Sequence, residues 1–380
     1  MATNSQSTTR VWTAAGGPGR AGLFPGPVRL APKPTRRLVA LGAMQASVVF
    51  DEQDRVFVAD MAGWVQAFTQ EGGLVWQRQL AGGVSASPAV DVEGGRVFIG
   101  THAGWVYALQ TADGAVLWRR SLPTKGDARI LSDLLYLPAQ QSVVLSSWGG
   151  QFHALDTASG ETKHTWDAGL WPQVGASADV QGNLYCLRTR RGEGVAFFRV
   201  SPDGKETVLH NQPESRRGAQ RMAVAAAPVL DEARGVVYFI TNGDRDCEVH
   251  AWLLQEQRHL WKRGLPRTVM ATPALGPTGN LLLADMEGSI HALAPDGASV
   301  FRYLSGADYL LAGPVCAADG HAFAGDPLGR LHAVDSTGEG GPVFEAARAI
   351  QARPAFDRRG NLYVPSTDRT IYVFRNLASG

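Results

Sequence analysis

Residues 86–122 read ASPAVDVEGGRVFIGTHAGWVYALQTADGAVLWRRSL, and this stretch decides the fold. It contains four short apolar segments, PAV, RVFIGT, WVYALQ and a last one that ends at Trp118, and turn-forming residues separate them. Apolar side chains recur at every second position, as in Val97 and Ile99 and again in Val106 and Ala108. This is the period of β-strands rather than helices. The stretch therefore predicts a small sheet of four strands.

The same order of strands and turns recurs along the chain. Repeats begin near residues 46, 86, 131, 176, 226, 271, 312 and 352, about 40 to 50 residues apart. This spacing is typical of a four-stranded propeller blade. One such sheet cannot bury both of its faces, whereas sheets stacked around a common axis cover one another. We therefore predict an all-β fold, a single eight-bladed β-propeller of four-stranded antiparallel blades.

The eighth repeat is incomplete, because only three strands precede the end of the chain. An open ring would leave an exposed sheet edge. We predict that the segment 36–45, with the strand RLVAL at 37–41, pairs as the outermost strand of the eighth blade and closes the ring. The propeller then spans residues 36–380. Residues 1–35 form an extended lead-in that crosses one face, since four prolines between 25 and 34 exclude a central strand.

Large aromatic residues recur on the outer strands of the repeats. We expect four of them to wedge between neighbouring blades as structural docking residues: Trp76, Trp118, Trp166 and Trp261. A ligand-stacking platform is the alternative, but the tryptophans recur with the repeat. Small residues recur where the inner strands begin, as in Ala86–Ser87 and Ala271–Thr272. Inner strands converge on the axis, where only small side chains fit.

Composition excludes several classes of function. The net charge of +1 gives no general attraction to nucleic acid or to anionic membranes. The three cysteines, Cys186, Cys247 and Cys316, are too dispersed for a disulfide framework or a zinc motif. No apolar run of about 18 residues could span a bilayer. The polar start MATNSQSTTR lacks the apolar core of a secretory signal, so a cytoplasmic location is expected unless the natural start lies elsewhere.

At its repeats the sequence resembles the PQQ-like (quinoprotein-type) propeller family, whose repeat has an alanine, an acidic residue and a Thr-Gly, followed by a tryptophan. The best match is ALQTADGAVLW, with Ala108, Gly114 and Trp118; ALDTASGETKHTW and AVDSTGEG match in part. The opening VWTAAGGPGRAG is similar to the lead-in often found before such propellers. The resemblance covers nearly the whole chain and implies the propeller fold.

The resemblance offers two functions. One class of the family comprises dehydrogenases that bind pyrroloquinoline quinone and Ca²⁺; a non-enzymatic class is similar to the propeller lipoprotein of the outer-membrane β-barrel assembly machine. This chain has no adjacent Cys-Cys pair, and no Glu/Asn/Asp set for Ca²⁺ stands out. It also lacks a lipid-attachment signal. We therefore expect a non-catalytic scaffold without a cofactor, with a quinone-dependent dehydrogenase as the alternative.

Standard catalytic motifs are absent from the sequence: there is no GxSxG, Walker loop or HExxH. No paired carboxylates stand out that would indicate a sugar-active or lyase-type propeller. Five of the nine histidines fall at or near third strands, namely His102, His153, His250, His291 and His332. Because these positions follow the repeat, we interpret the histidines as structural and predict no metal site.

The fourth and fifth repeats carry the longest interval and many arginines. In a propeller, the turns between second and third strands share a face with the loops between blades, so these residues should gather on one face. The predicted partner-binding residues are Arg129, Trp171, Gln173, Arg191, Arg216, Arg217, Arg221, Arg267, Tyr309 and Arg353. We expect a protein or acidic-peptide partner, a phosphate-bearing ligand being a further option. A solvated basic loop is the alternative, and nucleic acid is not expected.

Overall fold

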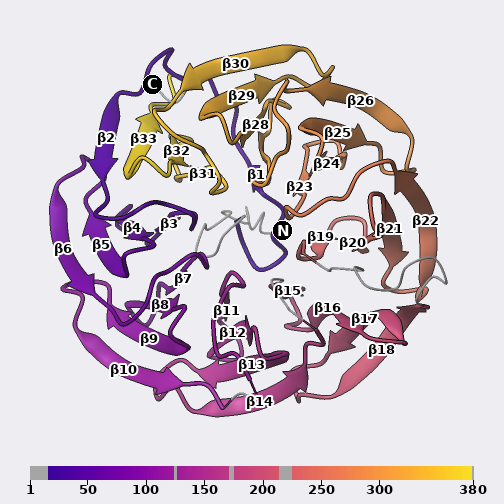
Figure 1. The fold of residues 1–380 in the computed structure, drawn as a ribbon, viewed down its shortest axis with the longest axis horizontal. Coiled ribbons are helices and arrows are strands. Elements are labelled where there is room, and N and C mark those ends of the chain that lie inside the picture. The colour runs from indigo at the N-terminus through magenta and orange to yellow at the C-terminus, as the bar shows by residue number, and fades with distance from the viewer. Residues whose placement is uncertain (1–15, 124–125, 171–174, 214–224, 379–380) are drawn as a thin grey trace, which may run out of the picture.

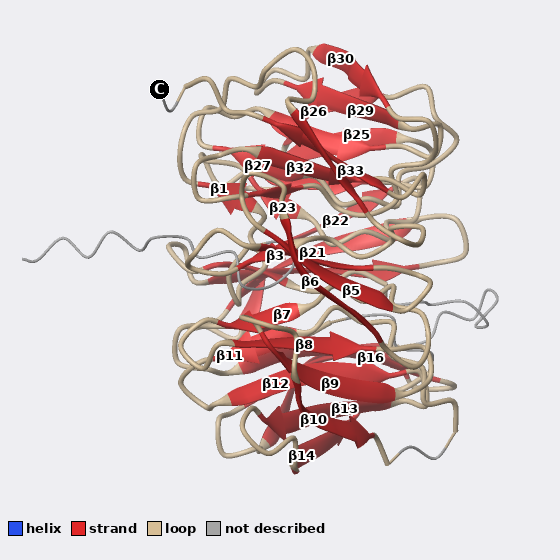
Figure 2. Ribbon diagram, turned by 90° about the vertical axis from the view of Figure 1, so that its left-hand side faces the viewer, coloured by secondary structure: helices blue, strands red, loops and turns tan. Residues whose placement is uncertain are grey.

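The computed structural model describes residues 16–123, 126–170, 175–213 and 225–378. Eight sheets stand side by side around a central axis, like the blades of a propeller (Figure 1). Seen from the side, the ring forms one thick disc of strands without helices in the described ranges (Figure 2). No helix in this part of the chain is long and apolar enough to cross a membrane. The predicted eight-bladed, all-β propeller is confirmed.

Each of the first four blades is a meander of four antiparallel strands, numbered from the axis outward. Blade 1 contains β3 (Val49–Phe50), β4 (Val56–Ala59), β5 (Trp64–Phe68) and β6 (Leu74–Gln79). Blade 2 contains β7 (Ala89–Asp91), β8 (Arg96–Gly100), β9 (Trp105–Gln110) and β10 (Val116–Ser121). Blade 3 contains β11 (Leu135–Leu137), β12 (Ser142–Ser147), β13 (Gln151–Asp156) and β14 (Thr162–Asp167). Blade 4 contains β15 (Ser177–Ala178), β16 (Leu184–Arg190), β17 (Gly194–Val200) and β18 (Glu206–Gln212).

The last four blades repeat this arrangement, and two of them also take a strand from the N-terminal segment. Blade 5 contains β19 (Val229–Asp231), β20 (Val236–Asn242), β21 (Cys247–Leu253) and β22 (Arg258–Leu265). Blade 6 contains β23 (Ala274–Leu275), β24 (Leu281–Ala284), β25 (Ser289–Leu293) and β26 (Ser299–Leu304). Blade 7 contains β1 (Leu23–Phe24), β27 (Val315–Ala317), β28 (Ala322–Gly325), β29 (Arg330–Val334) and β30 (Gly340–Glu345). Blade 8 contains β31 (Ala355–Phe356), β32 (Leu362–Pro365), β33 (Thr370–Phe374) and β2 (Arg36–Val39).

The ring is closed by the N-terminal strand, as predicted. Strand β2 pairs antiparallel with β33, and Leu38 lies opposite Ile371. The Leu38 side chain is buried in a cluster that includes Phe50 and Phe68 of blade 1 and Tyr363 of blade 8. One strand thus completes the last sheet and also supplies core for the first blade, so the two ends of the chain hold each other.

The hydrophobic core is a series of layers between neighbouring blades. In three of them a tryptophan on the outer strand of one blade lies against the turn that follows the third strand of the next. The indole N–H donates to a backbone carbonyl there: Trp76 to Thr111 (2.9 Å), Trp118 to Thr157 (3.0 Å) and Trp261 to Pro295 (2.7 Å). The indole N–H of Trp166 also donates to a carbonyl of the next blade, that of Gly204 (3.0 Å), although Trp166 lies two residues farther along its strand than the other three tryptophans do. All four tryptophans therefore bridge adjacent blades.

The proline-rich lead-in lies along the inner strands at the axis. The carbonyls of Pro18, Gly19, Ala21 and Gly22 accept N–H groups from the inner strands of blades 4, 5, 6 and 7 in turn. Strand β1 then pairs parallel with β27 as a fifth strand of blade 7. The carbonyl of Gly26 accepts the N–H of Ala318, in the turn between the first two strands of that blade. The turns between the first and second strands of the blades lie on one face of the disc, which we call the lead-in face. The turns between the second and third strands and the loops between blades lie on the opposite face, which we call the mouth face.

Candidate binding face and channel mouth

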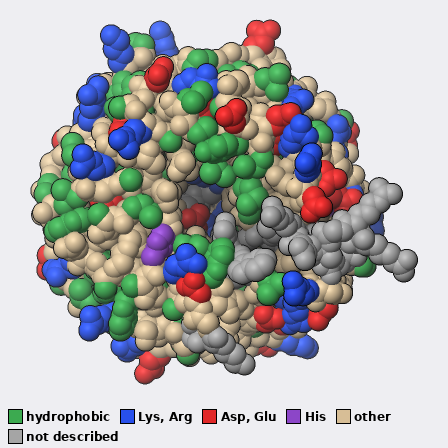
Figure 3. Space-filling model, in the orientation of Figure 1, with side chains coloured by type: hydrophobic (Ala, Val, Ile, Leu, Met, Phe, Trp, Pro, Cys, Tyr) green, Lys and Arg blue, Asp and Glu red, His purple; other side chains and the backbone are tan. Residues whose placement is uncertain are grey.

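A cavity of about 150 Å³ opens where the axis meets the mouth face (Figure 3). Every blade contributes to its wall the residue that stands two positions before its inner strand. In blade order these residues are Ser47, Ser87, Asp133, Gly175, Ala227, Thr272, Gly313 and Arg353. Six of the eight are small, as the crowding of eight inner strands requires. The two larger ones, Asp133 and Arg353, carry charges into the channel.

Hydrogen bonds across blade boundaries hold this mouth together. The Ser47 hydroxyl donates to the Arg353 carbonyl (2.8 Å), and the Ser87 hydroxyl accepts the Ser47 N–H (3.1 Å). The Asp133 carboxylate accepts the Ser87 N–H (2.8 Å), which links blades 2 and 3. These short polar side chains therefore link the inner ends of blades 8, 1, 2 and 3 at the mouth.

Two buried arginines fill the channel below the cavity. Arg20, from the lead-in, donates to the carbonyls of Ala176 (2.8 Å) and Asp133 (3.0 Å), and the Asp133 carboxylate lies 3.8 Å from its guanidinium. Arg353 donates to the carbonyls of Pro273 (3.0 Å) and Pro314 (2.5 Å). Both side chains thus bind backbone of two neighbouring blades, Arg20 of blades 3 and 4 and Arg353 of blades 6 and 7.

Burial sets the electrostatics of this pair. It lowers the pKa of Arg20, an effect that Asp133 partly offsets, and it lowers the pKa of Arg353 to about 9. Both guanidinium groups still carry their charge at neutral pH. The Nε and Nη1 atoms of Arg353 are buried and have no hydrogen-bond partner among the described residues. The floor of the channel mouth is therefore a positive centre with unpaired donors.

The predicted partner-binding residues fall into three groups. Trp171, Gln173, Arg216, Arg217 and Arg221 lie outside the described residues. Arg129, Arg191, Arg267 and Tyr309 lie in turns and loops of the mouth face, whereas Arg353 lies inside the channel.

Acidic neighbours offset part of the predicted positive charge. Arg129 pairs with Asp127 (2.7 Å), and Arg267 pairs with Glu287 (2.8 Å). The side chain of Arg191 is exposed, in the turn between the second and third strands of blade 4. The described part of this face is therefore mixed in charge rather than strongly basic.

The mouth face also carries exposed leucines that the sequence analysis did not single out. Leu304 ends the outer strand of blade 6 and is 62% exposed; Leu328 lies in a turn of blade 7 and is 58% exposed. Leu170 and Leu311 are exposed in the loops between blades, and Leu311 also lines the cavity. Where exposed apolar side chains form a contiguous patch, they mark a protein-binding surface, so this face is the candidate. For Leu170, Leu311 and Leu328 the signal available in the sequence was a leucine within a turn or loop.

A quinone cofactor with its Ca²⁺ does not fit the channel mouth. Small-molecule sites usually measure roughly 300–1,000 Å³, and this cavity has about 150 Å³. Ca²⁺ takes about six to eight oxygen ligands, usually with several carboxylates. Among the described residues that line the cavity, Asp133 is the only carboxylate. The buried side chain of Arg20 is also part of the cavity wall.

Eight blades, each built on four antiparallel strands, docked by recurring aromatic residues and closed by an N-terminal strand, define a PQQ-like β-propeller. The family model described as outer membrane protein assembly factor BamB matches residues 61–295, more than half of the sequence. The chain therefore belongs to this family, and the predicted resemblance is confirmed.

Solved structures agree on the fold. BamB from Moraxella catarrhalis is 16% identical with a TM-score of 0.70, and the match covers 92% of this chain and 98% of that one. Quinohemoprotein alcohol dehydrogenase from Comamonas testosteroni is 13% identical with a TM-score of 0.75, covering 98% of this chain and 81% of that one. No curated protein matches the sequence. At such low identity these likenesses concern the fold alone.

Proposed function

We propose that this chain is a non-catalytic scaffold that binds a protein partner on its mouth face. The observation that carries the proposal is the set of exposed leucines on the face that holds a channel mouth too small for a cofactor. Apolar contacts would supply most of the binding free energy, with the charged side chains at the rim setting orientation. The description of its family as an assembly factor agrees with a protein that holds other proteins.

An acidic side chain on the partner would complement the floor of the mouth. Arg353 has two nitrogen donors there, Nε and Nη1, without a partner among the described residues, and the carboxylate of Asp133 already pairs with Arg20 and Ser87. Arg191, exposed on the same face, adds a second positive contact. We therefore propose a protein whose binding segment combines apolar residues with at least one carboxylate.

Cross-linking in native cells tests the proposal. The double variant Leu304→Glu and Leu328→Glu should abolish the capture of specific partners, because burying a charged side chain in an apolar interface costs desolvation free energy. Val116→Glu is the matched control, since Val116 is 42% exposed on an outer strand away from the mouth. Capture that is equal for the wild-type chain, the double variant and the control would refute the mouth face as the interface.

The alternative is a quinone-dependent dehydrogenase, which the fold likeness to the Comamonas enzyme brings into consideration. It predicts that the purified chain binds pyrroloquinoline quinone tightly when Ca²⁺ is added. The scaffold proposal predicts no stoichiometric binding, because the cavity is small and Asp133 is the only carboxylate among its described lining residues. Equilibrium dialysis followed by quinone absorbance distinguishes the two, and a complex with one quinone per chain would overturn the scaffold.

A further inference from the structure

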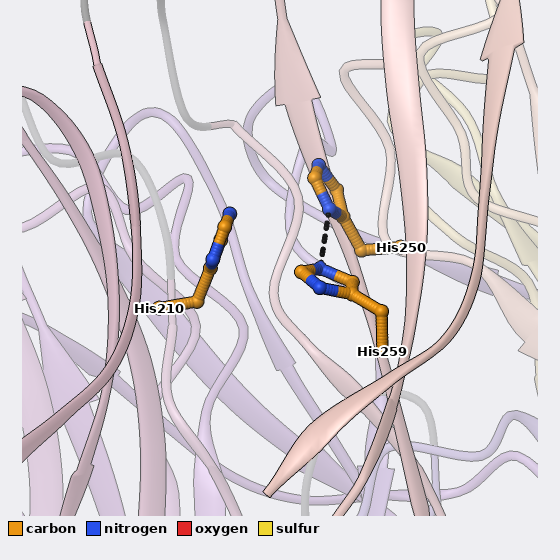
Figure 4. A group of neighbouring side chains, drawn as sticks. All are labelled: His210, His250 and His259. Atoms are coloured by element: carbon orange, nitrogen blue, oxygen red, sulfur yellow. Dashed lines mark hydrogen bonds between the residues drawn. The ribbon is translucent and has the colours of Figure 1, made fainter.

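Three histidines meet at the boundary between blades 4 and 5 (Figure 4). His210 lies on β18, the outer strand of blade 4, whereas His250 and His259 lie on β21 and β22 of blade 5. One ring nitrogen from each lies within 4.8 Å of the others. Nδ1 of His250 and Nε2 of His259 are 3.1 Å apart. Segments far apart in the sequence thus bring three nitrogen ligands to one point.

The register of the sheets shows that His210 departs from the repeat. In blades 1, 2 and 5 the outer strand has a one-residue bulge, and a docking tryptophan follows it opposite an alanine: Ala67 with Trp76, Ala108 with Trp118, and Ala251 with Trp261. Blade 4 has the same bulge, and there His210 follows it, opposite Phe197. His210 therefore takes the place of the residue that docks one blade onto the next.

Hydrogen bonds fix the orientation of the buried His250 ring. The Thr241 hydroxyl donates its proton to the side-chain oxygen of Gln212 (3.0 Å), so it accepts from Nε2–H of His250 (3.0 Å). The carboxylate of Glu248 lies 3.4 Å from the same Nε2. The lone pair of His250 is thereby on Nδ1, which faces the cluster. An outer hydroxyl or carboxylate partner of this kind is typical of histidines that bind metals.

The other two rings are also suited to a metal. Nε2 of His210 is buried and has no hydrogen-bond partner among the described residues. Burial lowers the pKa of all three imidazoles, that of His250 to about 2 and that of His259 to about 4, so the rings are neutral at neutral pH. Among the described residues, Lys262 is the nearby cation that opposes a metal, and it lies 3.7 Å from the Glu248 carboxylate, which partly offsets its charge.

We propose that His210, His250 and His259 bind Zn²⁺, or another divalent transition metal that prefers imidazole, and thereby join blades 4 and 5. Two nitrogens on a tetrahedral zinc lie about 3.3 Å apart, given Zn–N bonds of about 2.0–2.1 Å. The pair of His250 and His259 already matches this separation, and His210 needs to move by less than about 2 Å. On binding, His259 shifts its proton from Nε2 to Nδ1, and no net proton is released. Water fills the fourth position.

Metal titration of the full-length chain, purified without a histidine tag and treated with chelator, tests the proposal. We expect the chain to bind one Zn²⁺, measured by calorimetry, and to give the visible absorption of four-coordinate Co²⁺. His210→Phe keeps a ring in the interface but removes the ligand, and His259→Ala removes another; each should weaken binding by more than about 100-fold. Glu248→Gln removes only an outer partner and should weaken it by about 10-fold.

His164→Ala is the matched control. His164 follows the equivalent bulge on the outer strand of blade 3, but it stacks on Trp166 and belongs to no histidine cluster among the described residues. This variant should bind Zn²⁺ like the wild-type chain. Circular dichroism of each variant checks that the strands are intact. Zn²⁺ should raise the melting temperature of the wild-type chain and of His164→Ala, but not that of His210→Phe or His259→Ala. No Zn²⁺ binding to the wild-type chain, or equal binding by folded His210→Phe, would overturn the proposal.

Discussion

Replacing Gly114 with alanine should destabilise the propeller through its contact with Trp76 in the preceding blade. Gly114 has φ +70°, and a Cβ there would lie 2.5 Å from Cε3 of the Trp76 ring. The left-handed backbone alone costs alanine about 1–2 kcal/mol. Crowding against a packed ring adds about 1–3 kcal/mol. We therefore expect Gly114→Ala to lower the free energy of unfolding by about 3 kcal/mol, measured by urea denaturation.

A double-mutant cycle separates the two costs. Trp76→Ala alone should cost about 3–5 kcal/mol, because it empties a buried aromatic site. In that background Gly114→Ala no longer meets the ring and should cost only about 1 kcal/mol, which gives a coupling of about 2 kcal/mol. Gly95→Ala is the control: Gly95 has φ +63°, and its nearest neighbour would be Thr111 at 3.7 Å. Additive costs, or equal costs at Gly95 and Gly114, would refute the docking contact.

Three further changes address closure, hydrogen bonding and pH. Leu38→Ala should lower the free energy of unfolding by about 2–5 kcal/mol, whereas Val39→Ala, at a site 65% exposed, should leave it nearly unchanged in the same urea assay. Trp118→Phe keeps most of the packing but loses one buried indole hydrogen bond, so its cost should be about 1 kcal/mol. Lys163 and turn N–H groups lower the pKa of Asp156 to about 2. The ionised Asp156 carboxylate therefore stabilises the fold above pH about 4, and this stabilisation is lost as the pH falls toward 2. Its size is under about 1 kcal/mol, because the pair with Lys163 is partly exposed. Asp156→Asn should remove this pH dependence of the melting temperature, and a pH profile equal to that of the wild-type chain would contradict the prediction.

The blade count and the closing strand could be predicted because both follow from local patterns. Alternation as in Val97 and Ile99 defines strands, and the missing fourth strand of the last repeat requires a partner such as the segment around Leu38. The path of the lead-in could not be predicted in the same way. Its position depends on carbonyls such as those of Pro18 and Ala21, which bond to four different blades, and backbone acceptors leave no signature in the sequence.

The candidate site was only partly predictable. The choice of face follows from propeller topology, and it places Arg129, Arg191 and Arg267 together on the mouth face. The sequence does not reveal which arginines are paired: Asp127 and Glu287 offset two of them, and Arg353 turns into the channel toward proline carbonyls. These outcomes depend on side-chain geometry between blades rather than on spacing within one repeat.

The histidine cluster shows what a repeat-based interpretation overlooks. His250 was interpreted as structural because it lies on a third strand, and neither His210 nor His259 follows the repeat. Aligning the outer strands by their bulges would have shown a histidine in blade 4 where Trp76 stands in blade 1. That alignment requires the register of the strands, which the irregular length of the fourth repeat obscures in the sequence.

The two strongest departures from the repeat have a common physical logic. Arg353 stands where seven blades place an uncharged residue or a carboxylate, and its burial is costly unless its donors are paired. His210 stands where a tryptophan docks the next blade in blades 1, 2 and 5, so its interface lacks the packing and the indole hydrogen bond that four other blade boundaries have. A ring that is otherwise repetitive retains such exceptions where something compensates for them. For Arg353 the compensation we infer is the partner's carboxylate at the mouth, and for His210 it is the metal that joins the two blades.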